Sequence, residues 1–282
     1  MVGIIADALT TEIVILGHGL TVAERSEVSP GVFLEPSVPK VDLTAASTSS
    51  RDFRDYSASV TASELATFSL EVRGGKGQEL VSKAWNALWF FHLLSLACSA
   101  PCFSLCAIAR GRAEQYSAAN RNVIFRPLPL IATATPPQIT WAKANLPSFD
   151  RLISEPVFSS AMRCYGNAHY LFDFDTRIML LWAGIEGLLA VDAELNRRLA
   201  LYAALLHKGS TAEKIAYFKE VKKAYAIRSR TVHGGKATPE KLRLGYQASS
   251  SILVRLLARC VELGRVPSTD ELDALAVSQT LT

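Results

Sequence analysis

The chain has 282 residues, of which 49% are hydrophobic and 20% are charged, a composition typical of globular rather than disordered proteins. Its net charge of +4 is modest for this length and does not by itself indicate a nucleic-acid-binding protein. Five irregularly spaced cysteines argue against a disulfide framework, and the N-terminus lacks the basic start of a signal peptide. We therefore expect a cytoplasmic protein.

The N-terminal half carries a mixed pattern. Residues 11–22 form an apolar, β-branched run typical of a strand, and residues 26–59 contain clusters of Pro, Ser, Asp and Gly that favour loops and short strands. Helical patterning begins near Thr61, and this helix is expected to end before the glycine-rich residues 73–77. The sequence thus predicts a mixed α/β region over residues 1–150, with no indication of its role.

One stretch of this half, residues 84–108, contains no charged side chain and is long enough to span a bilayer. However, Pro101 interrupts it, and Asn86 lies inside it. These features favour a buried helix over about 78–98 followed by a buried strand over about 102–109, with a membrane span as the alternative.

Three cysteines of this stretch, Cys98, Cys102 and Cys106, have three residues between neighbours. Zinc sites use similar spacings, but these thiols have apolar neighbours and His92 is the only imidazole nearby. Buried structural thiols are the preferred interpretation, and we expect no metal site here.

The C-terminal half is helical in pattern from about Leu146 onward. Residues 175–191 carry apolar side chains at helical spacing, and residues 195–206 form another helix. Residues 151–282 are therefore predicted to form an all-α bundle, which makes the chain mainly α overall. The apolar positions of the first of these helices are Ile178, Leu181, Trp182, Ile185, Leu188 and Leu189.

Two long helices are expected to end this half. Thr211 is a plausible N-cap for the first, which is expected to close at Gly234–Gly235 in a left-handed conformation. Thr238–Pro239 would begin the second, which is expected to end at Gly264.

Positive charge is concentrated around these helices. Residues 192–243 contain twelve Lys and Arg against five Asp and Glu, so the remainder of the chain sums to −3. A positive patch attracts polyanions, although a solvated helix face is the commoner cause of such a run.

Three segments of the half resemble a known family. The segments are "WAGIEGLLA" (182–190), "NRRLALYAALL" (196–206) and "YFKEVKKAYAIRSRTVHGG" (217–235). Together they resemble the Apea-like group of HEPN (higher eukaryotes and prokaryotes nucleotide-binding) domains over roughly residues 155–265. The shared features are a helix with a central Glu, a helix with paired arginines, and a helix that ends in Tyr-x-x-Arg-Ser-x-x-Val-His-Gly. Residues 1–150 show no independent resemblance.

The resemblance implies a metal-independent endoribonuclease, without cofactors, in phage defence or toxin–antitoxin biology. It implies a homodimer that cleaves RNA to a 2′,3′-cyclic phosphate, with Arg228 gripping the phosphate and His233 moving a proton. An antitoxin or regulatory protein is a further candidate partner, and no membrane is involved. The remaining site residues are Ser229, Glu186 and Tyr225 as supporting residues, and Arg197, Arg198, Arg230 and Lys222 as RNA contacts.

The helical spacing leaves two alternatives open. Five residues at about 100° each place Arg228 and His233 about 140° apart on a straight helix, so the site needs a distorted helix end, a long reach or a second subunit. Alternatively, Arg228 forms a structural pair with Glu186 and His233 merely ends a helix. The domain would then be a catalytically inactive module that binds nucleic acid, a nucleotide or a protein.

Overall fold

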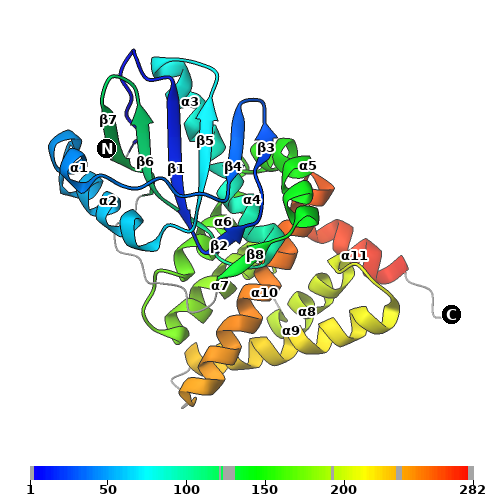
Figure 1. Cartoon of the computed structure of the whole chain (residues 1–282). Helices are drawn as coiled ribbons and strands as arrows, with labels where there is room; N and C mark the ends of the chain where they lie inside the picture. The colour runs from blue at the N-terminus through cyan, green and yellow to red at the C-terminus, as the bar shows by residue number, and fades with distance from the viewer. Residues whose placement is uncertain (1–2, 121, 123–130, 192–193, 233–236, 279–282) are drawn as a thin grey trace. The chain divides into compact units, whose positions relative to one another are not determined.

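A computed structural model of the chain describes residues 3–120, 122, 131–191, 194–232 and 237–278 (Figure 1). The backbone forms two compact units, Met1–Leu146 and Pro147–Thr282. The first unit contains an antiparallel sheet with helices, and the second is helical, so the chain is mainly α with a sheet in its N-terminal part. The boundary between the units falls inside helix α5 (Pro136–Leu152), a few residues before the predicted boundary at 150.

The sheet of the first unit has the strand order β3-β4-β5-β1-β6-β7, and every neighbouring pair is antiparallel. A separate parallel pair joins β2 to β8. The central strand, β1, is buried at every position after its first residue, which confirms the strand predicted within residues 11–22. The strands are β1 (Glu12–His18), β2 (Leu20–Val22), β3 (Ser26–Ser29), β4 (Val32–Glu35), β5 (Phe68–Arg73), β6 (Phe103–Arg110), β7 (Glu114–Ala118) and β8 (Ala132–Ala134).

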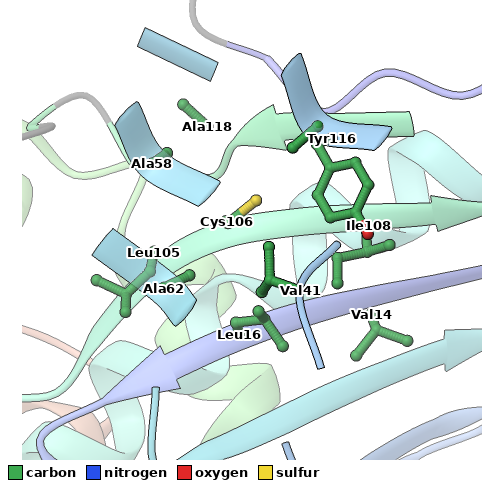
Figure 2. Close-up of a cluster of buried hydrophobic side chains, with 11 residues drawn as sticks. Val14, Leu16, Val41, Ala58, Ala62, Leu105, Cys106, Ile108, Tyr116 and Ala118 are labelled. Atoms are coloured by element: carbon green, nitrogen blue, oxygen red, sulfur yellow. The ribbon is translucent and has the colours of Figure 1, made fainter. Parts of the chain in front are cut away.

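One face of the sheet packs on helices α1 (Leu43–Ser49) and α2 (Phe53–Leu65). Figure 2 shows the apolar cluster between them, in which side chains of β1, β6 and β7 meet small residues of α2 such as Ala58 and Ala62. Small side chains let the helix approach the strands closely, and the buried apolar area stabilises the unit.

The opposite face is covered by helices α3 (Gly77–Ala87) and α4 (Trp89–Cys98). Gly17 of β1 lies opposite Phe68 of β5, and the Phe68 ring lies 5.5 Å from that of Phe91 in α4. A Cβ atom on Gly17 would lie 2.4 Å from Phe68 and 2.7 Å from Phe91. Glycine is therefore required here so that the two rings can approach the strand.

The helix predicted from Thr61 to before residue 73 is wrong at both ends. The observed α2 begins at Phe53, where the Asp52 side chain accepts hydrogen bonds from the Arg54 and Asp55 backbone amides, and it ends at Leu65. The following residues form β5 instead. The small and polar residues of α2 mask its helical period, whereas a side-chain N-cap suffices to start the helix.

The uncharged stretch 84–108 forms α3, α4 and β6, with a break between the two helices at Leu88. This agrees with the predicted buried helix and strand, apart from the break. Seven of the eight residues of β6 are buried. None of the helices in the described parts of the chain combines the length and apolar character that crossing a membrane requires.

The second unit is a bundle built around α7, which packs on α6 and α10. Trp182 of α7 is fully buried, and its indole Nε1 donates to the Ser249 hydroxyl of α10 at 2.9 Å. All six apolar positions predicted on α7 are buried, so the helical stripe is confirmed. The helices are α6 (Pro156–Ala168), α7 (Phe174–Leu189), α8 (Leu195–Leu206), α9 (Thr211–Val232), α10 (Pro239–Leu263) and α11 (Thr269–Ser278).

The ends of α9 and α10 test the predicted caps. Thr211 is not the N-cap of α9: Ser210 and Glu213 exchange hydrogen bonds in a capping box, because only Ser210 has a glutamate three residues later. For α10 the prediction is confirmed, since Thr238 accepts from the Lys241 amide and Gly264 closes the helix at φ 68°. The predicted cap at Gly234–Gly235 lies outside the described residues.

Candidate functional site

The candidate site centres on an ion pair between α7 and α9. One terminal nitrogen of Arg228 (Nη2) lies 3.0 Å from Oε1 of Glu186 and donates a hydrogen bond to Oε2 at 3.2 Å. Both side chains are 22% exposed, so the pair is mostly withdrawn from solvent. Glu186 therefore holds the guanidinium at the C-terminal end of α9, where the sequence predicted the phosphate-binding arginine.

The pair is incompletely satisfied. Arg228 uses a single nitrogen on the carboxylate rather than a parallel two-bond fork, and its buried Nε has no hydrogen-bond partner among the described residues. Burial raises the pKa of the Glu186 carboxyl above its ordinary value, and the Arg228 charge lowers it only in part. The arginine thus keeps donor capacity for a further acceptor.

The ring of Tyr225 contacts both Trp182 and Arg228. Its ring meets the buried Trp182 edge to face at 5.2 Å, and the Arg228 guanidinium carbon lies 5.6 Å from its centroid. The contact with Trp182 makes Tyr225 part of the helix packing, and the cation lies within the range of attraction by the ring. Tyr225 therefore packs against α7 and also attracts the arginine side chain.

His233, the predicted proton-transfer residue, lies outside the described residues, as does Gly234. Helix α9 ends at Val232, directly before this histidine in the sequence. Ser229 is half-buried on the same helix. The convergence of Arg228 with His233, in one chain or across a dimer, therefore stays a prediction.

The predicted RNA contacts fall into two groups. Arg197, Lys222 and Arg230 are exposed to solvent. Arg198 instead donates to the Tyr202 hydroxyl at 2.6 Å and lies 3.3 Å from the Asp273 carboxylate. Its contact with α11 suits a structural role better than a free phosphate contact, and Asp273 lies 75 residues along the chain from Arg198, so sequence reasoning missed it.

Helix α9 carries further exposed cations besides the predicted Lys222 and Arg230. Lys219, Lys222, Lys223 and Arg230 are all exposed and recur at helical spacing, so they lie on one side of the helix. We call these four residues the basic stripe. Acidic side chains are few along this side, which gives α9 a surface suited to a polyanion.

The three cysteines of the sheet unit have no disulfide partner. Burial raises the pKa of Cys98 to about 11 and that of Cys106 to about 12, so both stay protonated at neutral pH. Protonated thiols are poor metal ligands and poor nucleophiles. Within the described residues, no three His, Cys, Asp or Glu side chains are grouped closely enough to hold a metal ion.

Comparison of the chain with protein-family models, with curated proteins and with solved structures gives no match.

Proposed function

We propose that the chain is a metal-independent endoribonuclease of HEPN type, with Arg228 and His233 as its catalytic residues. The observation that supports this most is the Glu186–Arg228 pair, which fixes a guanidinium near the end of α9, a few residues before His233. A fixed cation beside a titratable imidazole is what cleavage of a phosphodiester requires.

RNA supplies its own nucleophile in this reaction. The 2′-hydroxyl attacks the neighbouring phosphorus, the bond to the 5′-oxygen breaks, and the products are a 2′,3′-cyclic phosphate and a 5′-hydroxyl end. His233 transfers a proton to or from these oxygens. Arg228 stabilises the extra negative charge of the phosphorane-like transition state, while Glu186 and Ser229 orient the arginine and the backbone at the helix end.

The basic stripe would hold the RNA strand on the side of α9 that faces away from Arg228, so the Arg228 that meets this strand would come from the second copy. The four cations of the stripe contact phosphates without selecting a base, which favours binding that weakens as salt rises. Tyr225 is largely committed to Trp182, so base stacking on it is a smaller part of the proposal. The protein would act as a homodimer, because the spacing of Arg228 and His233 favours a site completed by a second copy. The proposed setting is the cytoplasm, in phage defence or toxin–antitoxin biology.

One observation favours a different function. The carboxylate of Glu186 already forms an ion pair with Arg228, as it would in a purely structural role. A catalytically inactive domain that binds nucleic acid, a nucleotide or a partner protein is therefore the second candidate. The two candidates differ in whether His233 is required for a chemical step.

The test is a gel assay of RNA cleavage with wild type and two variants, in EDTA. Cleavage should persist in EDTA, spare DNA and leave cyclic phosphate ends. His233→Ala should lower the rate about 10²–10⁴-fold, the usual contribution of a positioned proton-transfer group. Arg228→Lys should lower it about 10²-fold, because an ammonium does not reproduce the planar guanidinium.

Arg163→Lys is the matched control, since Arg163 is an exposed arginine of α6 that donates to Ser159 within its own helix. It should cleave at the wild-type rate. Loss of cleavage in EDTA, or undiminished cleavage by a folded His233→Ala protein, would remove the mechanism. Sedimentation of an active monomer at micromolar concentration would remove the dimer.

A further inference from the structure

A pocket of about 260 Å³ opens between α8, α9 and α10, away from the Glu186–Arg228 pair. Its floor is apolar and buried, formed by Ala203, Leu206, Tyr217 and Leu256. The His207 ring lies 4.6 Å from the Tyr217 ring at 32°, which adds an aromatic wall. Such a floor accepts a compact apolar or planar group.

Two buried donors at this pocket lack an acceptor among the described residues. They are Arg259 Nε and the Tyr217 hydroxyl, whose polar neighbour is the Arg255 guanidinium, itself a donor. Tyr217 is only 2% exposed, and burial raises the pKa of its hydroxyl, so the group keeps its proton at neutral pH. Buried donors without acceptors are costly, and both would be satisfied by an oxygen acceptor inside the pocket.

The rim is cationic. Lys208, Arg255 and Arg259 line the pocket against one carboxylate, Glu262, which lies 2.8 Å from Lys208 and 3.3 Å from Arg259. The Arg255 guanidinium lies over the Tyr217 ring at 5.1 Å and pairs with the Glu220 carboxylate outside the lining at 3.8 Å. The lining carries three cations against one carboxylate, and Glu220 reduces the local excess to one positive charge.

These features define the ligand. The surplus of positive charge matches an anion, and guanidinium groups with a hydroxyl donor match phosphate oxygens. The apolar floor and aromatic wall require a carbon body next to that phosphate. The volume lies below the roughly 300–1,000 Å³ of usual small-molecule pockets, so the body must be compact.

We propose that the pocket between α8, α9 and α10 binds a small organic phosphate monoester, with its phosphate between Arg255, Arg259 and the Tyr217 hydroxyl and its body on the floor. This inference is independent of the proposed RNA cleavage, because the two sites share no residue.

The probe is phenyl phosphate, titrated calorimetrically into the full chain beside inorganic phosphate and phenol. Phenyl phosphate should bind at a single site and more tightly than either fragment. Arg255→Ala should weaken it about tenfold or more, as loss of a charge-assisted hydrogen bond does. Tyr217→Phe keeps the ring and the fold, and should weaken it about three- to tenfold.

Arg243→Ala is the matched control, because Arg243 is an exposed arginine of the same helix that pairs with Glu240 outside the pocket. It should leave the affinity for phenyl phosphate unchanged. Absence of saturable binding at millimolar concentration, equal affinity for inorganic phosphate, or equal weakening by Arg243→Ala and Arg255→Ala would each overturn the proposal.

Discussion

The sheet unit contains twelve basic and twelve acidic residues, whereas the whole net charge of +4 lies in residues 147–282. One buried carboxylate from each unit illustrates two ways of satisfying an ionic group. In the sheet unit, Asp55 is 2% exposed and accepts hydrogen bonds from the Arg51 side chain and the Ala118 amide. In the helical unit, Glu186 has one hydrogen bond, and Arg228 retains an unused donor.

The comparison separates two uses of an arginine–carboxylate pair. A carboxylate with several donors joins a helix to a strand and stabilises the fold. A pair with unused donors costs stability and leaves capacity for a ligand. Asp55 thus serves the structure of the sheet unit, whereas the Glu186–Arg228 pair of the helical unit keeps a donor available for an anion.

The largest effect that the comparison predicts is at Asp55. Asp55→Ala removes the acceptor of a buried amide and of Arg51, and should lower the free energy of unfolding by about 3 kcal/mol. Urea denaturation measures this loss. Glu64→Ala is the control, since Glu64 is an exposed acid of the same helix, and it should change stability by less than about 0.5 kcal/mol. Equal losses of unfolding free energy in Asp55→Ala and Glu64→Ala would contradict the structural role assigned to Asp55.

A smaller effect is expected at His169, which is buried in the helical unit and bonded to the Tyr246 hydroxyl at 2.6 Å. Burial, with a smaller contribution from Arg177, lowers its pKa from 6.5 to about 3. The unfolded chain therefore gains a proton below about pH 6.5 that the folded unit does not. Stability should fall as the pH decreases from about 6.5 to 5, by up to about 1.4 kcal/mol per pH unit and about 2 kcal/mol in all.

Hydrogen exchange of peptides from α6 and α7, followed between pH 7 and pH 5, measures this loss after correction for the intrinsic exchange rate. His169→Gln removes the titrating group and should flatten the dependence. The raised pKa of Glu186 acts in the opposite direction near the acid end of the range, because folding then favours the protonated carboxyl. An unchanged slope in His169→Gln would contradict the assignment.

The smallest effect on stability is expected at Glu186 itself. Glu186→Gln removes a partly buried charge and keeps the side-chain shape, so the unfolding free energy should change by less than about 1 kcal/mol. RNA cleavage should nevertheless decline, because Arg228 loses the group that holds it. Thermal unfolding and the gel assay, run on the same preparation, measure the two quantities. A large loss of stability would make Glu186 equivalent to Asp55 and end the contrast between the units.

The sequence predicted the helical unit better than the sheet unit for a physical reason. Helix α7 repeats its apolar side chains every turn, so one segment reveals its own buried face. Helix α2 packs through alanine and serine, which give no such period, and its start depends on Asp52 alone. The strand β5 was missed because its pairing with β1 and β4 is not visible in its own six residues.

The same reasoning applies to the candidate sites. Glu186 and Arg228 could be foreseen because a carboxylate on an apolar stripe requires a partner. The α8–α9–α10 pocket could not be foreseen. Tyr217 is far along the chain from Arg255 and Arg259, and these residues line one pocket only after the three helices pack together. His233, the predicted proton-transfer residue, lies outside the residues that the structure describes.

The position of β1 in the sheet has a consequence for synthesis of the protein. This apolar strand leaves the ribosome before its neighbours β5 and β6, and the pairing with β6 extends to Arg110. At about 5–20 residues per second, the nascent chain exposes β1 for several seconds before both edges are covered. Chaperones that bind emerging hydrophobic segments should therefore engage residues 12–18 until β5 and β6 have emerged.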